Sequence, residues 1–302
     1  MKPIAPGVAW ERTLYANLYF VGEPGGPWAM VDAGPPGAFA RLRAAAEARY
    51  GADARPEAVY LTHGHFDHAG SALALATYWD VPIYAHRLEL PYLTGRSPYP
   101  PADPTPGGAV CFLCRFFPFN DADLGDRVQA LPEGHLPGLP GWEVIETPGH
   151  SPGHVCFFRA SDRVLLAGDA FATVDMDRAR TLITQRRQIA RPPTGFTCDW
   201  VGVRRSLHRL ADLQPYTVAS GHGTPMIGTE VAERLADFAG GFAAPRSGRY
   251  VSEPARTDEN GIVALPPAPP DPLPKVLACV AIAALAGAAL AVAARRKKRT
   301  ER

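Results

Sequence analysis

The sequence predicts a fold in which α-helices and β-strands are mixed around a large core, and three observations support this expectation. The chain has 302 residues, of which 46% are hydrophobic, so it can bury one large core or two smaller ones. From residue 14 to residue 85, short apolar runs alternate with segments of helical spacing in the order β-β-α-β-α-β. The 32 prolines and 29 glycines favour many loops between short elements.

The first elements are a hairpin followed by alternating helices and strands. Residues 14–21 and 28–31 are apolar runs joined by the turn residues GEPGGP, which is typical of a β-hairpin. A short buried strand is expected at 58–61 and leads directly into the histidine-rich stretch THGHFDHAG. Around it we expect helices at 37–50 and 69–79 and a further strand at 81–85.

Residues 95–141 break this alternation, because RSPYPPADPTPGG is too rich in proline and glycine for regular structure. A long loop of this kind is typical of a lid or a substrate wall. The aromatic run CFLCRFFPF within it also fits an exposed apolar patch that docks on a membrane surface, which is the competing interpretation. Beyond the loop we expect strands at 142–146, 155–158, 164–167 and in YTVASGHGTPM, and helices at 199–213 and 227–242.

Four stretches of the sequence place metal-binding side chains directly after predicted strands. THGHFDHAG alone would fit a solvated turn, but VIETPGHSPGH, VLLAGDAF and TVASGHGTP carry the same kinds of side chain. Because each polar residue follows a strand, all of them can converge at one edge of a sheet, where proteins of this class place their sites. The candidate ligands are His63, His65, Asp67, His68, His150, Asp169 and His222.

Imidazole and carboxylate side chains in this number indicate a site for two metal ions. They are the ligands that zinc, iron and manganese accept, and two ions need about seven protein ligands if one ligand bridges. We therefore expect two divalent metal ions as cofactors, zinc first, with iron or manganese as alternatives. Two cations about 3.5–4 Å apart lower the pKa of a shared water enough to give hydroxide near neutral pH. The expected grouping is His63, His65 and His150 on one ion, Asp67, His68 and His222 on the other, and Asp169 as the bridge.

This H-x-H-x-D-H motif, followed by isolated His, Asp and His at the ends of later strands, resembles the metallo-β-lactamase superfamily over about residues 5–245. The resemblance implies an α+β four-layer αβ/βα sandwich, in which two sheets face each other with helices outside. It also implies that Asp32, in VDAG, is structural and lies near the metals without binding them.

Differences between this sequence and particular branches of the superfamily narrow the resemblance to a subgroup. His68 and Asp169 stand where the main β-lactamases carry Arg and Cys, so the chain is more similar to glyoxalase II and the lactonases. Phe66 stands where the diiron flavoproteins of this fold carry an acidic residue, and their flavodoxin domain is not recognisable. The glutathione-binding helical domain of glyoxalase II is not recognisable either.

The activity implied is hydrolysis of an ester, thioester or lactone in a small-molecule substrate by a metal-bridging hydroxide. Asp67 is the candidate catalytic residue, which orients the nucleophile or carries its proton to the leaving group. Three alternatives stay open: a persulfide dioxygenase-like enzyme with one iron at His63, His65 and His150, a phosphodiesterase on the same fold, and a non-catalytic, membrane-tethered binding protein.

Several other side chains admit two interpretations. His154, just after HSPG, either holds His150 or a nearby backbone group, or has no part in the site. His86 is expected at the surface or in a cap. Cys111 and Cys114 form a C-x-x-C without a second pair, so apolar packing is favoured over a redox pair or half of a zinc site.

Charge is unevenly distributed along the chain. The whole chain carries a net charge of +1, but the tail 295–302 contains six basic residues and one acidic residue, which leaves the first 294 residues with a net charge of −4. A mildly acidic body argues against nucleic acid as a partner. The five cysteines are odd in number and scattered, which suggests a reducing compartment.

The C-terminal region predicts a membrane anchor. Residues 276–294 contain no charged side chain, and as a helix they would span about 28 Å, roughly one bilayer core. The RRKKR that follows favours a cytoplasmic tail, whereas the absence of a signal peptide favours a cytoplasmic body, which is the orientation we expect. The predicted domains are a hydrolase domain at 1–250, a Pro-rich linker at 251–275, a single transmembrane helix at 276–294 and a basic tail at 295–302.

Overall fold

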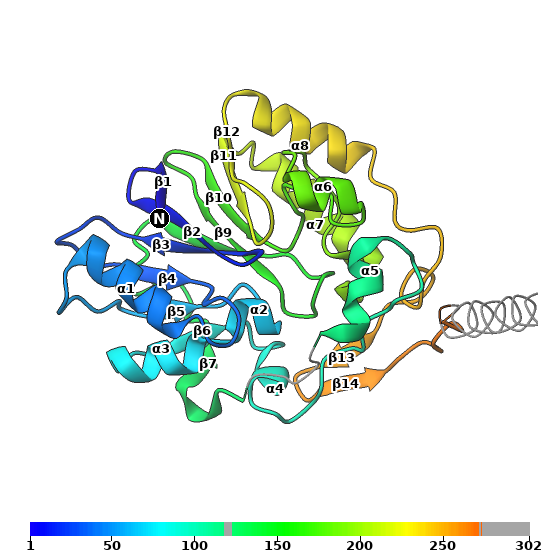
Figure 1. Cartoon of the computed structure of the whole chain (residues 1–302), viewed down its shortest axis with the longest axis horizontal. Coiled ribbons are helices and arrows are strands. Elements are labelled where there is room, and N and C mark those ends of the chain that lie inside the picture. The colour runs from blue at the N-terminus through cyan, green and yellow to red at the C-terminus, as the bar shows by residue number, and fades with distance from the viewer. Residues whose placement is uncertain (118–122, 272, 274–302) are drawn as a thin grey trace, which may run out of the picture. The chain divides into compact units, whose positions relative to one another are not determined.

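The computed structural model describes residues 1–117, 123–271 and 273. The chain divides into two units, Met1–Pro267 and Ala268–Arg302, and the first unit contains both large sheets and all of the candidate ligands. Its strands and helices are labelled in Figure 1.

Seven strands form the first sheet in sequential order (Figure 1). The first four are antiparallel to their neighbours, and the last four run parallel to one another, so that β4 belongs to both sets. The carboxyl ends of the parallel strands lie at the same edge of the sheet, where polar motifs follow β4 and β5. The strands are β1 Lys2–Ala5, β2 Val8–Thr13, β3 Ala16–Val21, β4 Ala29–Val31, β5 Val59–Tyr60, β6 Ile83–Ala85 and β7 Val128–Ala130.

Five strands form the second sheet in the order β12-β11-β10-β9-β8. β10 and β11 are parallel, and the other neighbours are antiparallel. The parallel pair therefore delivers the residues that follow both strands to the same edge. The strands are β8 Trp142–Glu146, β9 Val155–Arg159, β10 Val164–Gly168, β11 Thr217–Ser220 and β12 Met226–Ile227.

Alternating side chains of the strands bury both faces of each sheet. In β3, Tyr19 and Val21 point into a core that the two sheets share, whereas Leu18 and Phe20 point to the opposite face, toward the first helices. The same period of two separates Phe157 in β9, which lies between the sheets, from the next residue, which lies under the outer helices. This alternation explains why the central strands are apolar at nearly every position.

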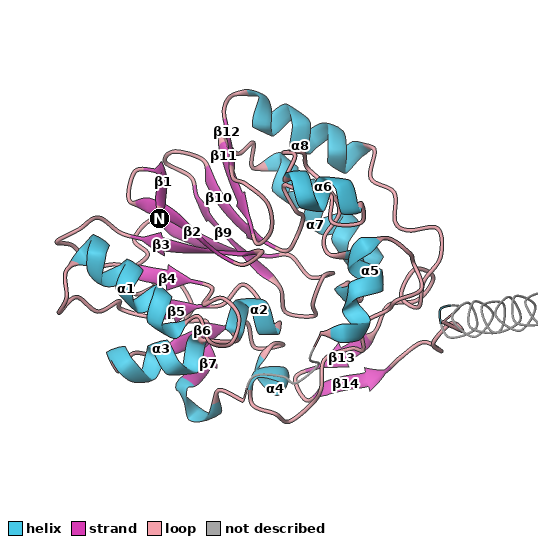
Figure 2. Ribbon diagram, in the orientation of Figure 1, coloured by secondary structure: helices cyan, strands magenta, loops and turns pink. Residues whose placement is uncertain are grey.

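Helices cover the two outer faces of the pair of sheets (Figure 2). The core cluster of the first sheet contains residues of α1 and α3, and that of the second contains residues of α7 and α8. The order of layers is helix, sheet, sheet, helix, so the expected αβ/βα sandwich is confirmed. The α-helices are α1 Phe39–Tyr50, α2 Phe66–Ala69, α3 Ala72–Trp79, α4 Leu90–Leu93, α5 Ala109–Leu113, α6 Ala179–Thr184, α7 Trp200–Asp212 and α8 Glu230–Gly240.

The described part of 95–141 contains more regular structure than the sequence predicts. It includes α5, the 3₁₀ helices η1 Cys114–Phe116 and η2 Gly125–Arg127, and β7. β7 is only three residues long and completes the first sheet by pairing with β6. Its formation depends on this partner distant in sequence, so the local sequence pattern does not predict it. β1 and β2 were likewise not expected, because the charges of Glu11 and Arg12 obscure the alternation; Glu11 is buried between the N-terminal amine and Arg41.

The compact unit extends to Pro267, beyond the boundary at residue 250 expected from the sequence. Residues of the expected linker form a hairpin, β13 Arg256–Asp258 and β14 Gly261–Ala264, in which the Ile262 N–H donates to Ser97 Oγ at 3.2 Å. The predicted transmembrane helix at 276–294 and the basic tail at 295–302 lie outside the described residues and stay predictions. Within the described residues, the structure contains no helix with the length and hydropathy needed to cross a membrane.

Phe157 provides a test of the core between the sheets. Its side chain is fully buried and makes an edge-on ring contact with Tyr60 of the other sheet at 5.7 Å. We expect Phe157→Ala to lower the free energy of unfolding by about 3–5 kcal/mol, because it leaves a cavity where the sheets meet. Urea denaturation measures this loss. Val263→Ala, at a side chain that is 54% exposed, is the control and should change stability by about 0.5 kcal/mol or less.

Candidate metal centre

Asp32 fixes the histidine motif against the first sheet. It follows β4 with a positive φ of 61°, which turns its carboxylate toward the end of β5. There the carboxylate accepts hydrogen bonds from the Thr62 backbone N–H at 2.8 Å and from the Thr62 hydroxyl at 2.9 Å. It also contacts His68 Nδ1 at 2.8 Å, which leaves His68 Nε2 free to face the site. Asp32 therefore orients a candidate ligand, as the resemblance implies.

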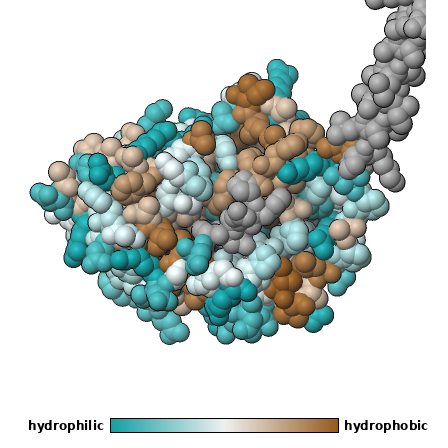
Figure 3. All heavy atoms as spheres, turned by 60° about the horizontal axis from the view of Figure 1, so that its bottom comes forward, coloured by the Kyte–Doolittle hydropathy of each residue, from teal (hydrophilic) through white to brown (hydrophobic). Residues whose placement is uncertain are grey.

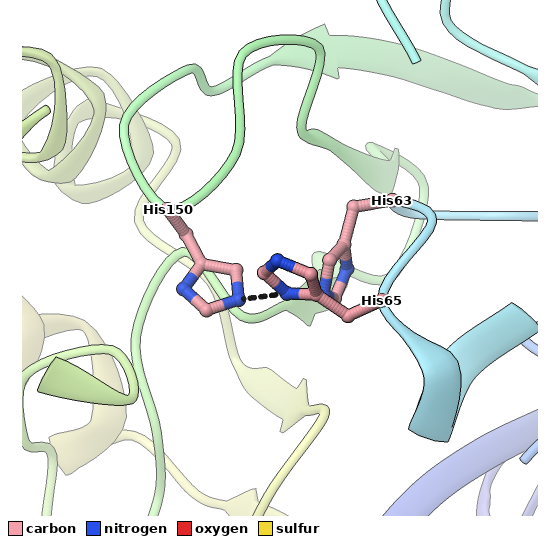
Figure 4. Close-up of side chains that lie close together, drawn as sticks. All are labelled: His63, His65 and His150. Atoms are coloured by element: carbon pink, nitrogen blue, oxygen red, sulfur yellow. Dashed lines mark hydrogen bonds between the residues drawn. The ribbon is translucent and has the colours of Figure 1, made fainter. Parts of the chain in front are cut away.

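Three imidazoles meet on one side of the site. His63 and His65 follow β5, and His150 lies in the loop between β8 and β9 (Figure 4). His65 Nδ1 is 2.9 Å from His150 Nε2, and the rings of His63 and His150 are 4.8 Å apart. One nitrogen from each ring lies within 4.8 Å of the other two, which is the spacing of ligands around a single ion.

A second group lies beside the first. α2 presents Asp67 and His68, and His222 follows β11. Asp67 Oδ2 is 3.7 Å from His68 Nε2 and 3.5 Å from His222 Nε2. These three side chains also offer one ligand atom each within 4.8 Å of one another.

Asp169 lies between the two groups. It follows β10, and its Oδ2 is 3.4 Å from His150 Nε2 and 3.0 Å from His222 Nε2. Its Oδ1 is 3.7 Å from His68 Nε2. The structure thus brings all seven predicted ligands together, and Asp169 forms a further compact group with His63 and His68.

The chemistry of these side chains fits metal ions. His63 Nε2, His68 Nε2 and Asp169 Oδ1 are buried without a hydrogen-bond partner among the described residues. Such atoms are costly to bury unless something else satisfies them, and cations would do so here. Five imidazoles and two carboxylates suit zinc, iron or manganese.

Burial and charge act on these histidines in opposite directions. Burial lowers the pKa of His65 to about 4, so this imidazole is neutral and able to donate a lone pair to a metal at physiological pH. Burial also acts on His68, but the neighbouring carboxylates of Asp67 and Asp169 outweigh it and raise the pKa of His68 to about 10. The surroundings of the second group are therefore more negative than those of the first.

His154 supports Asp169 from behind. Its Nε2 accepts a hydrogen bond from the Asp169 backbone N–H at 2.8 Å, and its Nδ1 contacts the Thr147 hydroxyl at 2.8 Å. Burial lowers the pKa of His154 to about 3, consistent with a neutral ring that accepts at Nε2. Of the two interpretations that the sequence left open, holding a nearby backbone group is the one that fits.

Glu89 is a supporting residue that the sequence did not reveal. Its carboxylate is fully buried and accepts from the Gly64 N–H at 3.0 Å, the Gly153 N–H at 2.7 Å and the Ser151 hydroxyl at 2.7 Å. The Tyr99 hydroxyl is a fourth donor, and the Tyr99 ring packs on His65. Burial raises the pKa of Glu89, and the four donors limit that rise. One carboxylate therefore joins the loop of His63 and His65 to the loop of His150.

The only signal for Glu89 in the sequence is an acidic residue inside the apolar stretch LELPYL. That signal does not show which groups the carboxylate meets, because its four donors lie in three separate segments.

The remaining candidates lie apart from the seven ligands. His86 is half-buried and contacts the exposed Glu146 at 3.3 Å, and its Nδ1 accepts from the Leu88 N–H at 3.3 Å, which fits a cap better than a surface position. Cys111 and Cys114 are buried, and Cys111 packs in a small apolar cluster with Val110. Cys114 Sγ contacts the Cys111 carbonyl at 3.1 Å. This environment agrees with the apolar packing expected for the pair.

Comparison with known proteins agrees with this fold. The family model of the metallo-beta-lactamase superfamily matches residues 12–222. The probable metallo-hydrolase YflN of Bacillus subtilis is 41% identical over 245 residues, which cover 78% of this chain and 93% of that protein. The chain therefore belongs to the metallo-β-lactamase superfamily.

More distant relatives extend the comparison. Hydroxyacylglutathione hydrolase GloC of Haemophilus influenzae is 32% identical over 119 residues, which cover 39% of this chain and 50% of that protein. Among solved structures, the metallo-beta-lactamase family protein TTHA1429 from Thermus thermophilus has a TM-score of 0.54 at 23% identity, and the match covers 78% of this chain and 79% of that one. The latter similarity concerns the fold alone.

Gly221 tests whether the space between the ligands is needed. A Cβ at this position would lie 2.6 Å from His68 Cε1 and closer still to Asp169 Oδ1. We expect Gly221→Ala to displace Asp169 and to lower the metal content per chain, measured by inductively coupled plasma mass spectrometry. Gly240→Ala, where a Cβ would meet nothing within 4 Å, is the matched control and should retain the wild-type metal content.

Glu89→Gln tests the connection between the two histidine loops. The amide keeps one acceptor oxygen and turns an NH₂ group toward a backbone N–H that cannot rotate away. We expect a loss of about 1–3 kcal/mol in the free energy of unfolding and weaker metal binding, measured by urea denaturation and by metal titration. Glu146→Gln, at a side chain that is 62% exposed, should change neither. Unaltered stability in Glu89→Gln would contradict the role given to this carboxylate.

Proposed function

We propose that this protein is a hydrolase that holds two divalent metal ions and cleaves an ester, thioester or lactone bond. The observation that carries the proposal is the position of Asp169, whose Oδ2 lies 3.4 Å from His150 Nε2 and 3.0 Å from His222 Nε2. A carboxylate between two groups of imidazoles suits a pair of cations better than a single one, because it has two oxygens to share.

The seven side chains would hold the two ions in two groups. Zinc is the first candidate for these ions, and iron and manganese accept the same donors. Ions held there supply Lewis acidity, which acidifies a water molecule and polarises the carbonyl group of the scissile bond. The groups would be His63, His65 and His150 for one ion and Asp67, His68 and His222 for the other. Asp169, which contacts His150 of the first group and His222 of the second, would serve both.

Asp67 is the residue that we assign to proton transfer. Its side chain is 10% exposed and lines the cavity that opens from the site, so one carboxylate oxygen can face the substrate. From this position it orients a water molecule and passes a proton to the leaving group. Asp32 and His154 hold their partners from the opposite side and leave the cavity side of the site to the substrate.

Of the three bonds proposed, the thioester has additional support. One relative is a hydroxyacylglutathione hydrolase, and its name states that it hydrolyses an acylated glutathione, in which the acyl group is joined to sulfur. All three bonds present a carbonyl carbon with a heteroatom leaving group, so the same arrangement of residues serves each of them.

Asp67→Ala tests this assignment. We expect the variant to stay folded and to lose at least about 10²–10⁴-fold in kcat, because it removes the carboxylate that carries the proton and also a ligand of the second group. Turnover of ester, thioester and lactone panels, with circular dichroism to follow folding, measures this. Asp237→Ala, at an exposed side chain on α8, is the control and should behave like the wild type. Wild-type turnover in Asp67→Ala would refute the mechanism.

Metal content separates the proposed function from its rivals. Two metal ions per chain and hydrolysis support the proposal, whereas a single iron with oxygen uptake identifies a dioxygenase. Activity on phosphodiesters without activity on acyl compounds would also overturn it.

A further inference from the structure

A cavity of about 480 Å³ opens from the metal centre, within the range of about 300–1,000 Å³ found for small-molecule sites. His65, Asp67, His150, Asp169 and His222 form its polar end. Away from these residues its wall is largely apolar and includes side chains from several elements: Phe66, Val110, Leu113, Met176, Leu182 and Phe196. One end of the cavity therefore suits a reacting carbonyl and the rest suits hydrocarbon.

The polar side chains of the wall mostly bind one another. Beyond the metal centre, Arg12, Tyr15 and Gln185 are the polar residues that line the cavity in the described part of the chain. Arg12 donates to Gln185 at 2.9 Å and to Asn17 at 3.2 Å, and the Tyr15 ring stacks on His222. Arg12 and Gln185 therefore have partners within the protein, and the Tyr15 hydroxyl is the polar group of this wall that stays available to a substrate.

Leu14 is exposed at the edge of this cavity. It occupies the turn between β2 and β3 with a positive φ of 55° and is 78% exposed, although it also lines the cavity. Glycine or asparagine fits such a backbone better, and an exposed leucine gains nothing from the fold. Strained positions of this kind cluster at sites that contact ligands. Leu113, 38% exposed, is a second apolar side chain that is both exposed and part of the wall.

On the face drawn in Figure 3, apolar side chains gather in a few separate patches among hydrophilic ones. An exposed leucine by itself is ordinary on a surface of this kind. Leu14 differs because its exposure, its backbone conformation and its place on the cavity wall coincide.

We propose that the substrate carries an apolar acyl chain, which lies along this wall with its end at Leu14 while its carbonyl faces the metal centre. This inference rests on the hydrolase function proposed above and specifies the substrate of the same site. Each methylene of such a chain would leave water for an apolar surface, and the gain would appear in kcat/KM if the contact persists in the transition state.

Thioesters of a single thiol with acyl chains from acetyl to decanoyl test the proposal on the full-length, metal-loaded protein, below the concentration at which the substrates form micelles. We expect kcat/KM to rise about fourfold for each added methylene until the wall is covered, the factor that corresponds to about 0.8 kcal/mol per buried methylene. Equal kcat/KM for all chain lengths would overturn this inference and leave the hydrolase function standing. If protein with two bound metals hydrolyses none of these thioesters and none of the corresponding esters and lactones, the hydrolase function itself is overturned.

Leu14→Asn is the decisive variant. Asparagine suits the positive φ, so the variant should fold at least as well as the wild type, but it removes apolar surface from the wall. We expect the ratio of kcat/KM for decanoyl to that for acetyl thioester to fall about tenfold. Leu182→Gln, which alters the same wall from α6, should lower this ratio as well.

Ile183→Asn is the matched control for both variants. This side chain is 81% exposed on α6, beside Leu182 in sequence, and does not line the cavity. It should leave the ratio unchanged. A wild-type ratio in Leu14→Asn, or an equal fall in Ile183→Asn, would refute the place given to the chain.

Discussion

Burial of a carboxylate among five imidazoles is the constraint on which the rest of this structure depends. Asp169 and four of the five histidines are buried, and several of their polar atoms have no partner among the described protein atoms. Such an arrangement is stable only if other charges balance it and if the side chains are held in place. The donor set fits cations, and a network of hydrogen bonds behind the site supplies the positioning.

The residues behind the site come from separate strands and loops, and each holds one part of it. Asp32 orients His68, His154 holds the backbone of Asp169, and Glu89 joins the two loops that carry the other imidazoles. Because these supports are buried and hydrogen-bonded on several sides, the ligands need little reorganisation to bind metal. A similar constraint applies at Gly221, where any side chain would enter the space between Asp169 and His68.

Beyond the polar centre, the wall of the cavity is largely apolar. This contrast separates two tasks: the charged end acts on a carbonyl group, and the hydrocarbon wall selects what is attached to it. Much of the wall comes from α5, α6 and the β2–β3 turn, which carry none of the seven ligands and lie outside the shared core of the two sheets. Specificity in this protein can therefore change without altering the ligands or the sandwich that positions them.

The sequence by itself determined the chemical identity of the site and most of the sandwich. Metal-binding residue types directly after apolar runs predicted His63, His150, Asp169 and the other ligands, because a strand brings whatever follows it to an edge of the sheet. Only the tertiary structure showed the role of Glu89, the existence of strand β7 and the part of the cavity wall that Leu14 forms. Each depends on a partner distant in the chain: the donors of Glu89 lie in three segments, β7 exists through its pairing with β6, and Leu14 matters through what shares its cavity. Local sequence patterns do not predict such contacts, because the contacts arise from packing and not from the propensity of each segment.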